Sequence, residues 1–235
     1  EGQTTGLTEA SMAASDLDAY FTKMNRMRQK YADQIQIHIG FEVDYLPEFT
    51  EWTKDFLNEY GPQTDENLLS VHFLKGKNNH YWCVDDTVAD FQEGLLSQAA
   101  DSQALYVSYF KQVLASVNAD LGQFAPRRIA HMTLIKKFQD YFDLDHSFSV
   151  QNERLINGIL LAVKAQGRQL DLNAAGLYKT YCNEQYPTLE IIKMAKLLKI
   201  PFVYGSDAHS IDAVGQGYNC MASLVDGYQD LAWLR

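Results

Sequence analysis

Two kinds of hydrophobic pattern alternate along the chain. Short runs of mainly apolar residues predict strands, and longer runs with apolar residues three and four positions apart predict amphipathic helices. The predicted strands are QIQIHIG (34–40), LLSVHFL (68–74), RRIAHM (127–132), RQLDLNA (168–174) and PFVYGS (201–206). The predicted helices cover 16–33, 46–60, 101–119, 150–167 and 188–199. This strand–helix alternation is typical of a parallel sheet with covering helices.

Nothing in the pattern divides the chain into parts. Gly61 and Gly167 mark the ends of two predicted helices. No Pro/Gly/Ser-rich linker, internal repeat or low-complexity tract interrupts the 235 residues, of which 46% are hydrophobic. We therefore expect a single α/β domain over 1–235. The stretch 75–100, which includes KGKNNHYWCVDDT, is expected to cross one face of it, and long loops of this kind are commonly functional.

The composition of the chain limits the kinds of molecule that the protein is expected to bind. A formal net charge of −10 argues against nucleic acid or an anionic membrane, although bound divalent cations would still admit a small anionic substrate. No apolar run approaches the roughly 18 residues that a membrane span requires. Cys83, Cys182 and Cys220 lie far apart without a CxxC pair, which indicates a reducing compartment and a cytoplasmic protein. The sequence does not indicate an oligomeric state.

Polar residues that can bind metals recur where predicted strands end. In GSDAHS, Asp207 and His209 are two residues apart, so an extended backbone points both to one side. The other candidates at strand ends are Glu42, His72, His131 and Asn173. Each alone has a structural explanation, as a helix-capping carboxylate, a core histidine or a turn residue. Because the carboxyl ends of parallel barrel strands meet at one rim, their recurrence favours a metal site.

The donor set indicates the chemistry. Mixed imidazole and carboxylate ligands suit Zn, Mn or Fe. Glu42 would bridge two ions, His72 and His131 would complete one of them, and Asp207 with His209 would serve the other. Such ions clamp the attacking and leaving oxygens of a phosphoester, so hydrolysis is the expected reaction.

The remaining histidines fall outside this ring. His80 lies on the long loop, where it either contacts substrate or is exposed to solvent. His38, within a predicted strand, is expected to be structural, and His146 is expected to lie at the surface.

The stretches GFEVDY, LLSVHFL, RRIAHMTLIKKF, LDLNAAGLYK and VYGSDAHS, followed by VGQGY, occur in this order from about residue 35 to residue 218. In them the chain resembles the PHP (polymerase and histidinol phosphatase) superfamily, specifically its histidinol-phosphate phosphatases. The resemblance implies a distorted (β/α)7 TIM-like barrel with a cluster of three divalent ions. It also implies hydrolysis of L-histidinol phosphate to L-histidinol and phosphate in histidine biosynthesis, by metal-activated hydroxide attack on phosphorus.

The resemblance also implies roles for individual residues. It makes Glu42, His72, His131, Asp207 and His209 metal ligands, with Glu42, Asp207 and His209 at the catalytic centre. The residues expected to bind substrate are Lys136 or Lys137, Lys179 and His80. The two adjacent lysines are equivalent at this level, and surface charge is the ordinary alternative for all three.

The chain departs from the family at its beginning. Family members open with a strand that carries an H-x-H pair and a second strand that ends in another histidine, and neither is present. We therefore expect an N-terminal segment on the order of 40 residues to be missing, and three ligands with it. The alternatives are another PHP phosphoesterase, such as a phosphotyrosine phosphatase, an inactive truncated PHP domain, or a barrel sugar-phosphate enzyme without metals. An exonuclease is disfavoured by the acidic charge.

Overall fold

Five short parallel strands form the sheet that organises the protein. The structure is a computed structural model that describes residues 11–225. The strand order is β1-β2-β5-β6-β7, and each strand pairs in parallel with the next. The bounds are β1 Glu42–Asp44, β2 Leu68–Ser70, β5 Arg128–Ile129, β6 Gln169–Asn173 and β7 Phe202–Gly205. A separate antiparallel pair consists of β3 Phe73–Lys75 and β4 Tyr81–Cys83.

Helices connect these strands. The α-helices are α2 Leu17–Lys30, α3 Thr50–Tyr60, α4 Val88–Asp90, α5 Ser102–Asn118, α6 Val150–Ala165, α7 Leu189–Leu197 and α8 Tyr218–Leu224. A π-helical turn covers Phe91–Leu95. The 3-10 turns are Ala14–Asp16, Pro47–Phe49, Gly61–Gln63, Lys77–Asn79, Leu96–Gln98, Leu134–Lys136, Ala175–Tyr178 and Ile211–Ala213.

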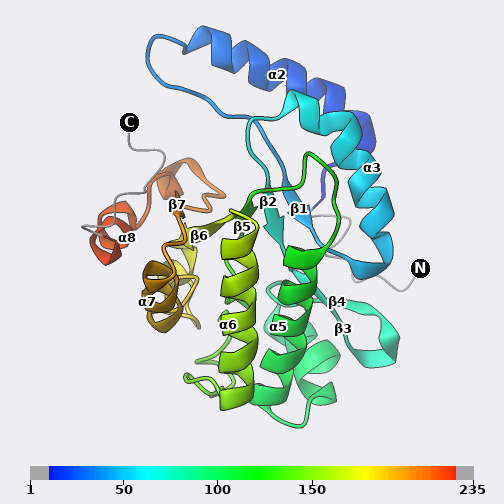
Figure 1. Ribbon diagram of the computed structural model, residues 1–235, viewed down its shortest axis with the longest axis vertical. Helices are drawn as coiled ribbons and strands as arrows, with labels where there is room; N and C mark the ends of the chain where they lie inside the picture. The colour runs from blue at the N-terminus through cyan, green and yellow to red at the C-terminus, as the bar shows by residue number, and fades with distance from the viewer. Residues whose placement is uncertain (1–10, 226–235) are drawn as a thin grey trace.

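The two longest helices, α5 and α6, lie side by side, with α7 next to α6 (Figure 1). Helices α5 and α6 each begin at a side-chain cap. The N–H of Ala104 donates to Asp101 in α5, and the N–H of Asn152 donates to Ser149 in α6. Buried residues recur on α6 three and four positions apart, at Ile156, Ile159, Leu160 and Val163. This apolar stripe packs into the main core together with the buried residues of the sheet.

The α/β class and the parallel sheet are confirmed. The five long helices predicted from periodicity all form, with ends within four residues of the predicted ones. Within residues 11–225, no strand pairs with the outer edge of β1 or β7. The single domain over 1–235 stays a prediction. None of the helices in the described part of the chain is long and apolar enough to cross a membrane.

The first strand prediction, 34–40, is wrong. Residues 35–41 carry no ladder pairing, and Glu42 begins β1 instead of following a strand. Side chains take the backbone donors of this segment: the N–H of Ile39 donates to Asp65 Oδ2 at 2.7 Å, and that of Phe41 donates to Asn67 Oδ1 at 2.8 Å. Hydrophobic alternation cannot distinguish these partners from a neighbouring strand.

The second strand prediction, 68–74, joins two separate strands. β2 ends at Ser70, and Phe73 begins β3, which pairs with β4 in the other sheet. The stretch 75–100 was predicted as a long loop, but it contains β4 and helical turns. The chain changes sheets at residues 71–72, so His72 lies just beyond β2.

A buried ion pair crosses the strands at the centre of the sheet. Arg128 Nε donates to Asp171 Oδ1 at 3.1 Å, and Arg128 Nη2 donates both to the same oxygen and to the carbonyl of Tyr204 at 3.1 Å. Gly205 lies directly against this pair. A Cβ at residue 205 would lie 2.5 Å from Asp171 Oδ1 and 2.8 Å from Arg128 Nη2, so the site requires glycine.

Gly205→Ala is expected to lower the free energy of unfolding by about 1–3 kcal/mol, because the added methyl group must displace the ion pair. Urea denaturation measures the change. Gly158→Ala, within α6, is the matched control, because its Cβ would meet only Leu114 Cδ2, at 3.9 Å. That control is expected to raise the free energy of unfolding by about 0.5–1 kcal/mol, as alanine for glycine does in a helix. Equal stability of the two variants would contradict the packing argument.

Candidate metal centre

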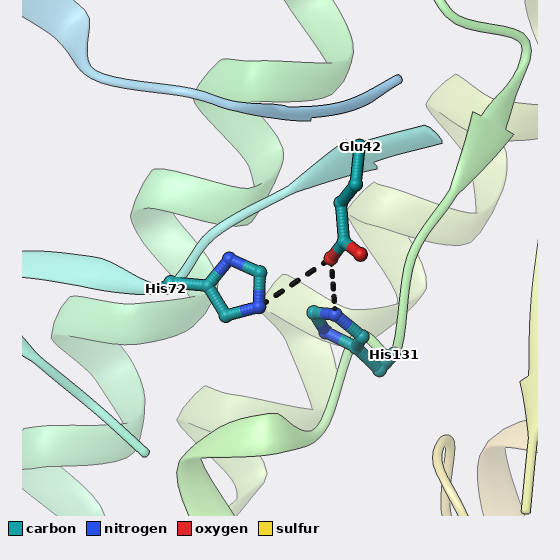
Figure 2. A group of neighbouring side chains, drawn as sticks. All are labelled: Glu42, His72 and His131. Atoms are coloured by element: carbon teal, nitrogen blue, oxygen red, sulfur yellow. Dashed lines mark hydrogen bonds and ion pairs between the residues drawn. The ribbon is translucent and has the colours of Figure 1, made fainter. Parts of the chain in front are cut away.

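Glu42, His72 and His131 come together from three neighbouring strands (Figure 2). Glu42 begins β1, His72 follows β2, and His131 follows β5. Glu42 Oε1 lies 2.8 Å from His131 Nε2 and 3.4 Å from His72 Nε2. One ligand atom from each residue lies within 4.8 Å of the other two. We call these three residues the Glu42 group.

The Glu42 group fits a divalent cation. Two imidazole nitrogens and a carboxylate oxygen form a donor set that Zn, Mn and Fe accept. His131 is 2% exposed, and its Nδ1 has no hydrogen-bond partner in the structure. A buried polar atom without a partner is unfavourable. The ligand role is supported by the donor set and by His131 Nε2, the nitrogen that faces Glu42.

Asp44 orients the His72 ring. Asp44 Oδ1 lies 2.7 Å from His72 Nδ1, so a proton on Nδ1 leaves Nε2 facing Glu42. The Oγ of Ser70 also donates to Asp44 Oδ1, at 3.4 Å. Sequence reasoning missed Asp44, although GFEVDY carries a signal for it: two residues after Glu42, it lies on the same side of the strand.

The charges of the group reinforce one another. Burial opposes ionisation of Glu42, but the hydrogen bond from His131 and the positive charges of both histidines lower its pKa to about 2. Burial also opposes the charged form of His72, but the hydrogen bond to Asp44 and the nearby carboxylates raise its pKa to about 10. The pKa of His131 is raised as well: burial opposes its charged form, and Glu42 outweighs that effect. A cation that binds here therefore displaces protons.

Asp207 lies two residues beyond β7, outside the Glu42 group. Its Oδ2 is 3.5 Å from Asn173 Nδ2, and Asn173 in turn donates to Asp171. The side chain of His209 is 81% exposed, with Nδ1 3.0 Å from the carbonyl oxygen of Asp207. The structure thus gathers three of the five predicted ligands, and the ligand roles of Asp207 and His209 stay predictions.

The two adjacent lysines differ in their surroundings. Lys136 is buried, and its Nζ donates to Glu184 Oε2 and to the carbonyl of His146, both at 2.9 Å. It lines a separate cavity of about 820 Å³. Lys137 Nζ donates instead to the backbone carbonyl of Asp85 and lies 3.4 Å from Asp85 Oδ2.

Asp85 connects Lys137 to the Glu42 group. Burial opposes ionisation of Asp85, but the positive charges of His72 and Lys137 lower its pKa, and His131 contributes in the same direction. The sequence analysis did not identify Asp85 as a site residue, because it lies in the long 75–100 stretch and not at the end of a predicted strand. Of the other predicted substrate residues, Lys179 is half-buried, and His80 is exposed between β3 and β4.

Comparisons with known proteins support this fold. A family model described as PHP-associated matches residues 189–231. A histidinol-phosphatase of Bacillus subtilis (strain 168) is 37% identical over 214 residues, which are 91% of this chain and 78% of the relative. A Deinococcus radiodurans protein named as a probable histidinol-phosphatase is 29% identical over 206 residues, which are 87% of this chain and 69% of that protein.

A solved structure extends the likeness to the fold. The crystal structure of a Listeria monocytogenes protein, provisionally described as the histidinol phosphatase hisK, superposes with a TM-score of 0.90 and 45% sequence identity. The match covers 94% of this chain and 81% of that protein. The sequence relatives, the shared fold and the Glu42 group agree, and the chain belongs to the PHP-type histidinol-phosphatase family.

Proposed function

We propose that the protein is a metal-dependent phosphomonoesterase that hydrolyses L-histidinol phosphate to L-histidinol and inorganic phosphate, as a cytoplasmic step of histidine biosynthesis. The observation that carries the proposal is the Glu42 group, which lies at one end of the parallel sheet. The chain that holds it is 37% identical to a histidinol-phosphatase. His72 and His131 follow the carboxyl ends of β2 and β5, and Glu42 reaches them from the start of β1. The carboxyl ends of parallel strands are where barrel enzymes place their active sites.

Glu42, His72 and His131 would hold one divalent ion, and Asp207 with His209 would supply ligands to a neighbouring ion of a three-ion cluster of Zn, Mn or Fe. Bound ions of this type stabilise charge on phosphoryl oxygens and make a nucleophile available near neutral pH. Glu42 suits a shared position, because a pKa of about 2 keeps its carboxylate ionised across the physiological range. Asp44 keeps His72 Nε2 directed at the site through its contact with Nδ1.

Lys137 would meet the substrate phosphate, with Lys179 and His80 as further substrate contacts. The contact between Lys137 and Asp85 supports this choice over Lys136, since Asp85 interacts electrostatically with His72 and His131. Lys136 already donates to Glu184 and to a backbone carbonyl in a different cavity. An ammonium beside the ions would bind an anionic phosphate as a point charge.

Removal of divalent ions is expected to abolish phosphate release. The experiment dialyses the full-length protein against a chelator, measures metal content by elemental analysis, and assays L-histidinol phosphate and phosphotyrosine before and after adding back Zn, Mn or Fe. Activity should fall with metal content, return on addition, and be greatest with L-histidinol phosphate. Turnover by metal-free protein would exclude the metal mechanism, and a preference for phosphotyrosine would exclude the substrate.

His131→Ala is expected to lower the metal content and to reduce kcat/KM by at least about 100-fold, because a direct ligand should matter no less than the residues that orient ligands. Elemental analysis and phosphate release measure the two effects. His146→Ala is the control, since this exposed histidine makes one long ion-pair contact, 3.7 Å to Asp140. The role of His131 would be refuted if its variant retained the metal content and kcat/KM of the control.

Lys137→Ala is expected to reduce kcat/KM by about 10- to 100-fold, the range for loss of one charged hydrogen bond. Lys136→Ala is the matched control one residue away. It is expected to lower the free energy of unfolding by about 1–3 kcal/mol, because Glu184 loses its partner, with a smaller effect on kcat/KM. The reverse pattern, with the larger kinetic loss at residue 136, would overturn the choice of lysine.

A further inference from the structure

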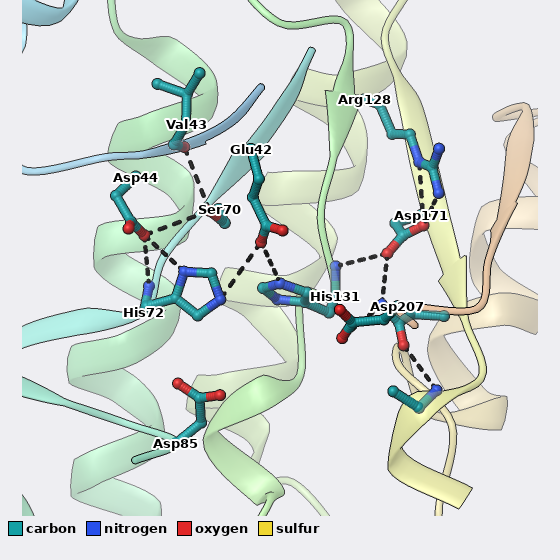
Figure 3. A network of polar contacts seen from close by, with 12 residues as sticks. Glu42, Val43, Asp44, Ser70, His72, Asp85, Arg128, His131, Asp171 and Asp207 are labelled. Carbon is teal, nitrogen blue, oxygen red and sulfur yellow. Dashed lines mark hydrogen bonds and ion pairs between the residues drawn. The ribbon is translucent and has the colours of Figure 1, made fainter. Parts of the chain in front are cut away.

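A buried network runs from β5 through β6 to the loop after β7 (Figure 3). At its centre is Asp171, which is 1% exposed. Its Oδ1 accepts from the Arg128 guanidinium, and its Oδ2 accepts from Asn173 Nδ2 at 2.9 Å and from the N–H of His131 at 3.5 Å. Both carboxylate oxygens are therefore occupied, and the Asp171 side chain has a fixed orientation.

The orientation of the Asn173 amide follows from its neighbours. Its Oδ1 accepts the N–H of Ala175 at 2.8 Å, so the NH2 group must be on the other side of the amide. There it donates to Asp171, whose carboxylate also accepts from the Arg128 guanidinium. The same NH2 group lies 3.5 Å from Asp207 Oδ2. Asn173 is thus a donor between two carboxylates that would otherwise repel each other.

Asp207 needs such support. Its backbone has φ of +51°, in the left-handed region that side-chain-bearing residues seldom adopt. Conformations of this kind persist where the surrounding structure holds them, and they occur often at functional sites. Asn173 is well placed to hold this one, because it is 2% exposed and its own N–H and carbonyl both pair with Tyr186.

We propose that Asn173 is a positioning residue, which holds the Asp207 carboxylate against the strand end that carries His131, through Asp171. The inference rests on the proposed ligand roles of His131 and Asp207. Asp171 would hold both residues in place. It accepts a hydrogen bond from the backbone N–H of His131, and it is connected to Asp207 through the amide of Asn173. The spacing between ligands of neighbouring ions would then depend on β6, which itself contributes no ligand.

Asn173→Ala tests the proposal, because it removes the amide and leaves the Arg128–Asp171 pair in place. Binding of Mn²⁺ and Zn²⁺ is measured by competition with a chromophoric chelator, together with metal stoichiometry and urea denaturation. We expect one ion to bind about 10- to 100-fold more weakly, as for other residues that orient ligands, while another stays bound. Asn173→Ser, which retains a hydroxyl too short to reach Asp207, should show the same loss with a smaller effect on stability.

Asn152→Ala is the matched control. Asn152 is also a fully buried asparagine, and its Nδ2 donates to the carbonyl and Oε1 of Gln103, at the start of α5, and to Ser149, the N-cap of α6. This variant should lose stability and keep the metal affinities of the wild type. If folded Asn173→Ala and Asn173→Ser both keep wild-type affinities and stoichiometry, the amide is merely structural and the proposal is overturned.

The outcomes separate this inference from the proposed function. Wild-type protein that binds metal, with loss in His131→Ala but not in Asn173→Ala or Asn173→Ser, would overturn the positioning role alone. Wild-type protein that binds no divalent ion would overturn both.

Discussion

The buried ion pair between Arg128 and Asp171 is the contact on which the geometry of the site depends. Charges removed from water are tolerated only when they are paired and hydrogen-bonded, and Asp171 meets this requirement because both its oxygens accept hydrogen bonds. These donors come from β5, from β6 and from the residue that becomes a proposed ligand, His131. The absence of a side chain at Gly205 lets β7 approach the pair. One electrostatic requirement therefore sets the relative positions of three strands at the edge where the chemistry is proposed.

The charged side chains of the Glu42 group are also paired with one another, as charges removed from water must be. Its carboxylate and imidazoles are partly compensated by one another and by Asp44, which accounts for the lowered pKa of Glu42 and the raised pKa of His72. Within the described residues, His131 Nδ1 has no hydrogen-bond partner. The site is thus arranged so that a cation replaces protons among groups that are already held in place.

The paired lysines show how a local turn separates two equivalent residues. Lys136 ends a 3-10 turn and Lys137 follows it, so their side chains leave the backbone in different directions. One enters a cavity beside Glu184, and the other reaches Asp85 near the histidines. In a protein with a net charge of −10, a cation beside the proposed metal cluster is one of the few features that would attract a phosphate ester.

Sequence alone determined the parts that depend on local pattern: the five long helices, the parallel sheet, and the three residues Glu42, His72 and His131 as members of one site. It did not determine where β1 begins, because Asp65 and Asn67 take backbone donors that a strand would otherwise have used. It also did not determine where β2 ends, because the chain passes to a second sheet at Phe73. Tertiary structure alone decided that Asp44 orients His72, that Lys137 contacts Asp85 whereas Lys136 contacts Glu184, and that Asn173 connects Asp207 to Asp171. The reason is physical: periodicity records which side of an element is buried, whereas a hydrogen bond between distant residues depends on how the elements pack.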